Sequence, residues 1–318
     1  MDEFLIKKAQ DRVNYGVGRI KAENKIKASI PKPRSISEVA IERMAEKELE
    51  KIAPSTGYPD LDRIIKGFVP GHLYTLTGNE NVGKTSLACN FAVRVAKQEK
   101  KVLYFALEPE NVVVDYVASV RFDKKFEDLT EEETGFDDGN IHVFGKEEVN
   151  KVDDLVKIVQ HSERYDLIVI DHIGYFIHGE GQNTNTEQSN AIKKLAGLAK
   201  SKKTAIVIIA HLRKPPNNSR KNYIPTSNDI SGSGSFKQDS TEVMIVVRNL
   251  ADPEAGGLEY ADDGNLFVTK TKAGANGFIQ LMFSERKANI VSAGELIEIN
   301  REKQKEAGYR LVEGDKKW

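Results

Sequence analysis

The sequence predicts an α/β fold with a mostly parallel, doubly wound sheet that is extended by late antiparallel strands. Short apolar runs without polar interruption alternate with helical segments between Tyr58 and residue 210. Such runs are typical of strands that helices cover on both faces, and a regular alternation of strand and helix is typical of a parallel sheet. After Gly234 the helical segments become rare, and strands joined by glycine-containing turns follow.

The elements can be assigned in order along the chain. Each expected strand is an apolar and often β-branched run, and the strands are 73–77, 102–107, 141–144, 167–170, 205–210, 243–247, 266–272 and 278–283. Each expected helix carries apolar residues at intervals of three and four. The expected helices are 85–97, 111–122, 153–161, 187–200 and, in the tail, 294–307.

Two segments precede the sheet. Residues 1–34 hold nine basic and four acidic side chains with little apolar periodicity, which predicts a flexible basic arm. Ser35 and Glu38 then form a capping-box pattern, and apolar residues at helical spacing predict a linker helix over 35–53. Its narrow apolar stripe must be covered, and we expect it to dock on a neighbouring subunit rather than on its own core. The core is expected over 55–285 and a tail over 286–318.

The composition is that of a globular protein, since 39% of the 318 residues are hydrophobic and 30% are charged. No run of about 18 apolar residues is present, so no contact with a membrane is expected. The single cysteine, Cys89, excludes an internal disulfide and a cysteine-based zinc site. The expected location is therefore the cytoplasm. Because the net charge is −1, contact with nucleic acid would need local basic patches.

The segment between the first core strand and the first core helix matches a phosphate-binding loop. Residues 78–85 read G-N-E-N-V-G-K-T, which is the pattern G-x-x-x-x-G-K-[ST] in full. In this pattern glycines let backbone amides face phosphate oxygens, the lysine reaches the β- and γ-phosphates, and the threonine hydroxyl ligates Mg²⁺. The sequence therefore predicts Mg²⁺-dependent binding of ATP, or of another NTP or dNTP. The predicted binding residues are Gly78, Asn79, Glu80, Asn81, Val82, Gly83, Lys84, Thr85 and Ser86, of which Thr85 also holds the metal.

Two carboxylates at strand ends complete the predicted site. Asp171 ends the apolar run 167–170, where it can hold Mg²⁺. Glu108 follows the strand 102–107, at the edge where open α/β sheets bind ligands. We expect Glu108 to act as the base that activates the attacking water.

Four short stretches together resemble one family. They are Y-F-A-L-E at 104–108, D-H-I at 171–173, A-H-L-R-K-P at 210–215 and G-S-G-S-F-K-Q at 232–238. Their order is similar to that of the RecA-fold hexameric helicases, with the phage-type replicative helicases and mitochondrial Twinkle nearer than bacterial DnaB. The resemblance covers about residues 55–285 and implies a RecA-like P-loop NTPase core. In that family six subunits surround one DNA strand, and NTP binds between neighbours.

The resemblance also implies roles for individual residues. Glu108 matches the catalytic glutamate, and His211 matches a sensor of the γ-phosphate. The long polar segment 212–233 matches a DNA-binding loop of the central channel, and 171–187 would form a second channel loop, without Lys or Arg. The implied DNA-binding residues are Arg213, Lys214, Arg220, Lys221 and Lys237.

One position departs from the family. An arginine finger is usual on a late strand, but this chain has Lys272 there, with Lys270 two residues before it. Alternation along a strand would place both lysines on one face. Two ammonium groups can neutralise phosphate charge in a neighbouring subunit, although without the bidentate fork of an arginine. A similar lysine pair occurs across the interface of RecA-type recombinases.

These observations favour a ring-forming NTP hydrolase that acts as a DNA helicase in replication, with 5′–3′ movement implied by the resemblance. The expected partners are single-stranded DNA, other copies of the chain in a hexamer, and a separate primase or loader. Two alternatives remain, a RecA-like recombinase or annealing ATPase and a ring-forming switch ATPase that binds a protein. The alternatives differ in where the cations of the long polar loop lie, which are Arg213, Lys214, Arg220 and Lys221. If these residues line the channel of a ring, the DNA-binding functions are favoured, and if they lie on the outer surface, the switch ATPase is favoured.

Overall fold

The computed structural model describes residues 33–107, 110–134, 139–177, 182–212, 225–230, 233–251, 260–283 and 289–297. The chain divides into two units, residues 1–48 and 49–318. The described part of the first unit is helix α2 (Ile36–Lys51), whose last turn crosses the boundary. The predicted capping box is present, because Ser35 N donates to Glu38 Oε2 at 2.8 Å and Glu38 N donates to Ser35 Oγ at 3.2 Å. No residue of α2 is buried.

The second unit is built on one nine-stranded sheet among its described residues, in the order β3-β2-β4-β5-β1-β6-β7-β8-β9. The strands are β1 (Leu73–Gly78), β2 (Val102–Ala106), β3 (Ile141–Gly145), β4 (Leu167–Asp171), β5 (Ala205–His211), β6 (Glu242–Leu250), β7 (Tyr260–Lys270), β8 (Gly277–Phe283) and β9 (Ile290–Ser292). The first six strands pair in parallel, and β7, β8 and β9 are added antiparallel. The predicted fold class is therefore confirmed.

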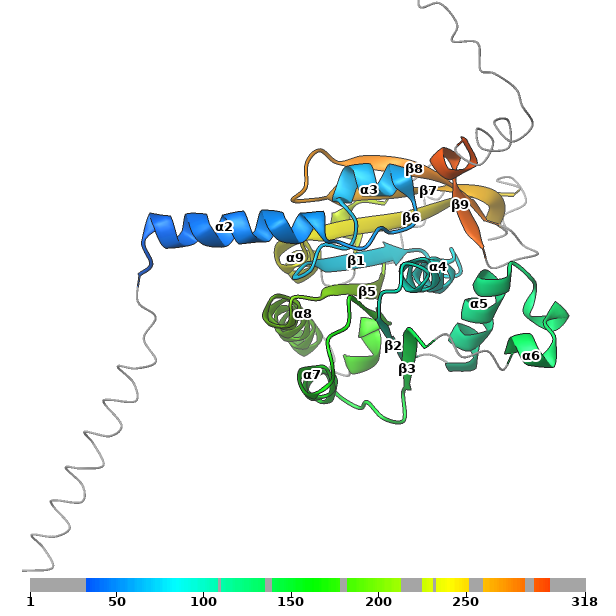
Figure 1. Ribbon diagram of the computed structural model, residues 1–318, viewed down its shortest axis with the longest axis horizontal. Helices are drawn as coiled ribbons and strands as arrows, with labels where there is room; N and C mark the ends of the chain where they lie inside the picture. Colours follow the sequence, from blue (N-terminus) through cyan, green and yellow to red (C-terminus); the bar gives the residue numbers. More distant parts are fainter. Residues whose placement is uncertain are drawn as a thin grey trace, which may run out of the picture. The chain divides into compact units, whose positions relative to one another are not determined.

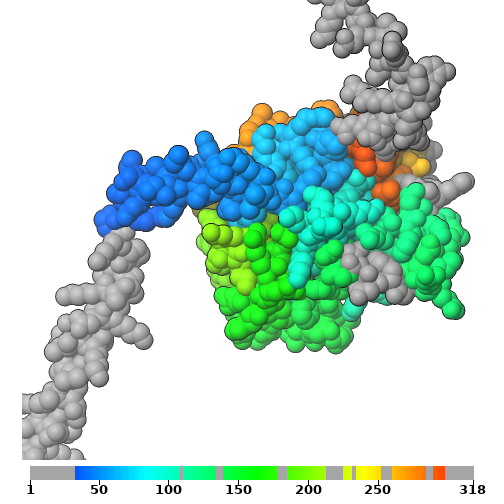
Figure 2. Space-filling model, in the orientation of Figure 1, coloured from blue at the N-terminus to red at the C-terminus, as the bar shows by residue number. Residues whose placement is uncertain are grey.

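Helices cover both faces of this sheet (Figure 1). They are α3 (Pro59–Ile65), α4 (Lys84–Ala96), α5 (Glu110–Phe122), α6 (Glu131–Thr134), α7 (Val152–His161), α8 (Gln182–Lys202) and α9 (Ser233–Asp239), with short 3₁₀ turns η1 (Phe126–Asp128), η2 (Ile173–Phe176) and η3 (Ser227–Asp229). Apolar residues of α3, α4 and α5 fill one side of the sheet, and those of α7, α8 and α9 fill the other. Helices α5 and α6 lie at the surface of the unit (Figure 2).

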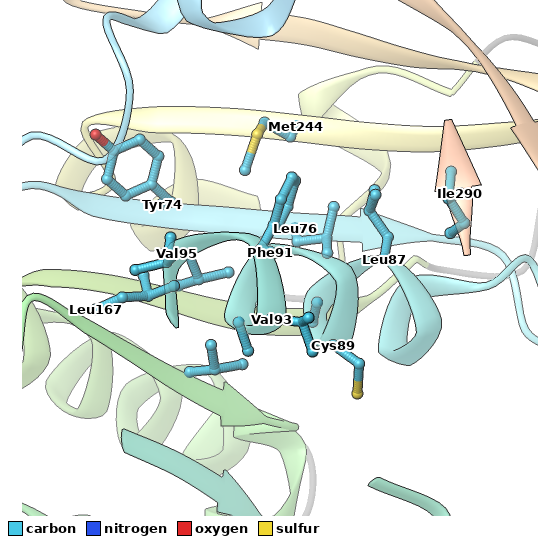
Figure 3. Close-up of a cluster of buried hydrophobic side chains, with 14 of the residues drawn as sticks. Tyr74, Leu76, Leu87, Cys89, Phe91, Val93, Val95, Leu167, Met244 and Ile290 are labelled. Carbon is cyan, nitrogen blue, oxygen red and sulfur yellow. The ribbon is translucent and has the colours of Figure 1, made fainter. Parts of the chain in front are cut away.

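Helix α4 lies at the centre of the first layer. Figure 3 shows Leu87 and Phe91 of α4 directed toward Leu76 of β1 and Met244 of β6, all of them buried. Burying one large apolar side chain contributes about 1.5–3 kcal/mol. The helix that follows the phosphate loop is therefore fixed firmly against the sheet.

A second set of contacts ties the ends of the second unit together. Arg94 of α4 donates to Gly57 O and Glu295 Oε1, both at 2.8 Å, and to Ile290 O at 2.8 Å. Its guanidinium lies 4.2 Å from the centroid of the Tyr58 ring, and the Tyr58 hydroxyl donates to Ile290 O at 2.8 Å. One arginine thus joins the segment before α3, the phosphate-loop helix and the last strand.

The structure differs from the sequence-based expectations in several elements. Helices α3, α6 and α9 and strand β9 were not predicted, because each is too short to show a period. Helix α8 begins at Gln182, earlier than expected, since its polar first turn carries no apolar pattern. The expected channel loop 171–187 contains η2 and the start of α8, and residues 178–181 lie outside the described ranges.

The two ends of the chain are described only in part. The expected tail helix is helical over 293–297, and its remainder lies outside the described residues, as does the basic arm up to residue 32. None of the helices in the described ranges is long and apolar enough to cross a membrane.

Candidate functional site

The predicted phosphate loop connects β1, which ends at Gly78, to α4, which begins at Lys84. A Cβ atom at Gly78 would lie 2.7 Å from Val246 O, so only glycine fits against the neighbouring strand β6. Asn81 and Gly83 have φ values of 57° and 95°, which is the left-handed region that tight turns use. The chain therefore turns sharply into the helix N-terminus, where unpaired backbone amides attract anions.

Lys84 lies at the centre of this loop. Its side chain is buried, and Nζ donates to Gly78 O at 3.2 Å and to Asn79 O at 2.7 Å. Thr85 and Ser86 follow in the first turn of α4 and are half-buried. The ammonium group and the threonine hydroxyl thus lie beside the same turn, as phosphate and metal binding require.

Three neighbouring strands end beside one another at this edge of the sheet. His211 ends β5 in register with Gly78 of β1, and Asp171 ends β4 on the other side of β5. The ring centroids of His172 and His211 are 4.4 Å apart in an edge-to-face arrangement. The tertiary structure therefore brings the loop, the carboxylate and the candidate sensor together.

Asp171 is only 2% exposed and is held by strand β2. Tyr104 Oη donates to Asp171 Oδ2 at 2.9 Å, and Leu107 N donates to Asp171 O at 2.7 Å. Burial, and then the charge of Asp171, raise the pKa of Tyr104 well above its ordinary value, so the phenol stays protonated and donates.

The oxygen donors at this edge fit Mg²⁺. Thr85 offers a hydroxyl and Asp171 a carboxylate, and Mg²⁺ commonly takes one or two such ligands together with substrate phosphates. No cluster of three or more His, Cys, Asp or Glu side chains that could hold a metal occurs in the described ranges.

Five predicted residues lie outside the described residues. They are Glu108, Arg213, Lys214, Arg220 and Lys221. Leu107, directly before the predicted base, bonds to the backbone of Asp171, so β2 ends at the same edge as the phosphate loop. His211 and Leu212 lead into the expected DNA-binding loop from this edge.

The two candidate finger lysines do not share a strand face. Strand β7 ends at Lys270, and Lys272 lies exposed in the turn that follows, so strand alternation does not extend to it. Lys270 Nζ donates to Lys237 O and Ser240 O, both at 2.5 Å, at the carboxyl end of α9. Partial burial, together with the charge of Lys272, lowers the pKa of Lys270. The expectation that strand alternation places both lysines on one face is therefore wrong, and their role as a pair at the nucleotide stays a prediction.

Lys237 itself lies on α9, the short helix after the G-S-G turn. Its side chain is exposed, and Nζ lies 3.3 Å from Asn228 Oδ1. It remains a candidate for contact with DNA.

Both lysines lie at the end of the strands opposite to the end that carries the phosphate loop of the same subunit. Lys270 pairs with Val243, and Val243 pairs with Thr75, three residues before Gly78. At about 3.3 Å per residue and 4.8 Å per strand, the Cα of Lys270 lies roughly 14 Å from that of Gly78, and Lys272 follows in the turn beyond the end of β7. A lysine side chain on its four-carbon stem does not span such a distance.

A buried carboxylate lies beside the lysine turn. Glu242 is fully buried at the start of β6, and its Oε1 lies 3.2 Å from His72 Nδ1. Burial raises the pKa of Glu242, and His72 and the backbone amide of Lys272 oppose that change.

Several side chains at the phosphate loop were missed by the sequence reasoning. Tyr260 Oη lies 3.2 Å from Glu80 O, and a Cβ atom at Gly83 would lie 3.1 Å from the Phe283 ring. The Arg248 guanidinium lies 4.6 Å from the centroid of Phe283. These residues come from late strands and support the loop from one side, and no local motif marks them.

Comparisons with known proteins agree with this geometry. The family model described as the DnaB-like helicase C-terminal domain matches residues 54–292. A replicative DNA helicase DnaB of Mycoplasma genitalium is 25% identical over 279 residues, which are 80% of this chain and 59% of the relative. Another from Buchnera aphidicola subsp. Schizaphis graminum is 23% identical, over 79% of this chain and 59% of the relative. The chain thus spans about three fifths of the length of these relatives.

A solved structure entitled "The Structure Of A DnaB-Like Replicative Helicase And Its Interactions With Primase" superposes with a TM-score of 0.66 at 17% identity, covering 89% of this chain and 76% of that one. It confirms the RecA-like fold. The family model covers well over half of the sequence, and the residues it matches include the loop, Asp171 and His211. The chain therefore belongs to the DnaB-like helicase C-terminal domain family.

Proposed function

We propose that the protein is a ring-forming, Mg²⁺- and ATP-dependent helicase that moves along single-stranded DNA and separates the duplex during replication. The observation that supports the proposal is the convergence of the phosphate loop, Asp171 and His211 at one end of the sheet, with Lys272, the proposed finger, at the opposite end. A ring of identical subunits places the second end of one copy against the first end of the next. Family membership favours this function over a recombinase or a switch ATPase.

The proposed roles of the loop residues follow from their positions. Lys84 exchanges its carbonyl partners for oxygens of the β- and γ-phosphates, and the amides at the start of α4 bind the same charge. Thr85 and Asp171 would hold Mg²⁺, which neutralises phosphate charge when it is bound. Glu108 deprotonates or orients the attacking water.

The proposed sensor and finger act on the same phosphate from two subunits. His211 ends the strand beside Gly78, where it can donate a hydrogen bond to the γ-phosphate. Leu212 follows it directly, so a shift of His211 on hydrolysis would move the start of the DNA-binding loop. Lys272 of the neighbouring copy supplies positive charge to the transition state.

Contact with DNA is proposed for Arg213, Lys214, Arg220, Lys221 and Lys237. Phosphate contacts of this kind give affinity without sequence preference. The loop leaves the core at His211 and α9 follows it, so DNA binding and hydrolysis would be coupled through a short stretch of chain. The apolar residues of α2, which include Ile36 and Met44 at 89% and 69% exposure, would dock on a neighbouring copy.

A hexamer, 5′–3′ movement, a cytoplasmic location and a separate primase or loader complete the proposal. The structure title quoted above describes a primase interaction for its own helicase. Support for the same partner here is the family membership of the chain.

Unwinding of a forked duplex with a labelled strand tests the proposal. The wild-type chain should separate the duplex only with ATP and Mg²⁺, and Lys84→Ala should abolish both unwinding and hydrolysis because the main phosphate-binding cation is lost. Lys66→Ala, on the turn after α3, is a matched control that should leave both unchanged. DNA-independent hydrolysis without unwinding would instead support the switch ATPase. Hydrolysis by Lys84→Ala within about tenfold of wild type would contradict the site.

A further inference from the structure

Tyr104 contributes a hydroxyl to the site that the roles above do not use. The side chain belongs to β2 and is fully buried, yet its oxygen lies 2.9 Å from Oδ2 of Asp171. A buried tyrosine usually finds a polar partner for its hydroxyl. The partner here is the carboxylate that would hold the metal.

The sheet register explains why this contact forms. Tyr104 pairs with Val169 across β2 and β4, so Asp171 is two residues further along and on the same face. Diagonal neighbours of this kind are about 7–8 Å apart between their Cα atoms, which a tyrosine can bridge. The contact is therefore set by the strands, and it does not depend on the rest of the phosphate loop.

Helix α4 reaches the same hydroxyl from the opposite side. Cys89 Sγ lies 3.8 Å from Tyr104 Oη, and Cys89 is fully buried. Figure 3 shows Cys89 leaving α4 on the side away from Leu87 and Phe91. Cys89 is four residues after Thr85, so the two residues share one face of α4 one turn apart.

The hydroxyl thus connects the two elements that carry the expected metal ligands. Thr85 lies on α4 and Asp171 lies at the end of β4. A thiol donates weakly and a phenol donates well, so the sequence of donors runs from Cys89 to Tyr104 to Asp171. Partners behind a metal ligand fix its orientation, and their loss typically weakens metal binding about 10–100-fold.

We propose that Tyr104 is a positioning residue that fixes the Asp171 carboxylate for Mg²⁺, with Cys89 tying this contact to the helix of Thr85. The inference rests on the proposed role of Asp171 in holding the metal. Tyr104 touches neither the nucleotide nor the metal in this account, and it acts only through Asp171.

Removing the hydroxyl has two opposing effects on metal affinity. Without the hydrogen bond from Tyr104, Asp171 keeps more negative charge, which favours a cation. Its carboxylate also gains rotational freedom that must be lost again on binding. We expect orientation to dominate, because loss of such partners generally weakens metal sites.

The test is a Mg²⁺ titration of the binding of a fluorescent ADP analogue, N-methylanthraniloyl-ADP, to the full chain, which needs no turnover. Tyr104→Phe should raise the half-saturating Mg²⁺ concentration about tenfold. Its affinity for the analogue in EDTA should stay within about twofold of wild type, since the phosphate loop is intact.

Tyr74→Phe is the matched control. Tyr74 is also fully buried and lies on the same face of the sheet, but its hydroxyl bonds to Val69 N and Gly67 O at the far edge. This control should leave the Mg²⁺ midpoint unchanged. An unchanged midpoint in Tyr104→Phe, or an equal shift in Tyr74→Phe, would overturn the inference.

Two further variants separate the possible failures. Cys89→Ala should raise the Mg²⁺ midpoint by a smaller factor, about two- to threefold, because a thiol is a weak donor, and it serves in place of Tyr104→Phe should that variant not fold. An unchanged Cys89→Ala midpoint would exclude α4 from the connection. Asp171→Asn should remove most of the Mg²⁺ dependence. If Asp171→Asn has the Mg²⁺ midpoint of wild type, the proposed metal role of Asp171 fails. If Asp171→Asn loses the Mg²⁺ dependence but Tyr104→Phe keeps the wild-type midpoint, only the positioning role of Tyr104 fails.

Discussion

Removal of the Lys272 ammonium group should stop hydrolysis without affecting nucleotide binding by the same subunit. The change is Lys272→Ala, and it affects an exposed turn beyond the end of β7. Because Lys272 follows the end of β7, at the end of the sheet opposite to the Gly78 of its own subunit, we expect its effect on hydrolysis to act on the loop of a neighbouring subunit.

The size of the effect follows from the chemistry of the finger. An arginine finger contributes about 10³–10⁵ in rate. A lysine is a point charge without a planar fork, so we expect a loss of about 10² or more. Lys270 cannot readily replace it, because its ammonium group already bonds to the carbonyls of Lys237 and Ser240.

The assay mixes two inactive proteins. The Lys272→Ala protein keeps an intact phosphate loop, and the Lys84→Ala protein keeps an intact Lys272. Mixed rings therefore contain some interfaces in which an intact loop meets an intact Lys272. For random mixing in equal amounts, about one quarter of the head-to-tail interfaces join an intact loop to an intact Lys272. The mixture should recover up to that fraction of wild-type ATPase activity, provided that neighbouring interfaces act independently.

Three results would refute the reasoning. The first is near-wild-type hydrolysis by Lys272→Ala alone. The second is loss of nucleotide binding by Lys272→Ala, measured with the fluorescent analogue, which would make the residue structural. The third is failure of the mixture to recover activity although gel filtration shows mixed rings.

Four further predictions concern other parts of the molecule. Glu108→Gln should leave ATP binding intact and slow hydrolysis by about 10² or more; an equal loss of binding, measured by fluorescence, would assign the residue a structural role. Removing Lys214 and Lys221 together should flatten the salt dependence of single-strand binding by about one to two units of slope, and an unchanged slope in anisotropy titrations would place DNA elsewhere. Arg94→Met should lower the free energy of unfolding by about 3–5 kcal/mol, because Glu295 and Gly57 O lose the guanidinium donor. A loss below about 1 kcal/mol in urea titrations would contradict this. Burial raises the pKa of Glu242 in the folded state, so wild-type stability should fall as pH rises above about 4.3. Glu242→Gln should therefore melt higher than wild type at pH 7.5, with the difference vanishing near pH 4, and a constant difference across this range would exclude titration of Glu242 as the cause.

The phosphate loop, Asp171 and the parallel part of the sheet could be predicted from local sequence. The loop needs glycine, lysine and threonine at fixed spacing because its chemistry is performed by one continuous turn. Asp171 is marked by the buried strand before it. The long apolar runs also identify the parallel strands, because burial on both faces leaves no polar alternation.

Short elements and distant contacts could not be predicted in this way. The end of β7 at Lys270 is decided by pairing with β6 and β8, which a strand pattern alone does not show. The strand pattern therefore placed Lys272 on the same strand as Lys270, whereas β7 ends at Lys270, whose side chain bonds to α9, a helix too short to recognise.

The sequence by itself thus identified the candidate residues for binding phosphate and metal, because these are marked by their neighbours in the chain. Only the tertiary structure decided that Tyr104 contacts both Asp171 and Cys89 and that Arg94 joins both ends of the core unit. It also decided that β7 ends, just before Lys272, at the end of the sheet opposite to the phosphate loop. Each of these depends on strand order and register, which bring together residues far apart in the chain. Contacts of this kind leave no local pattern, because the same side chains would suit many other positions in a buried sheet.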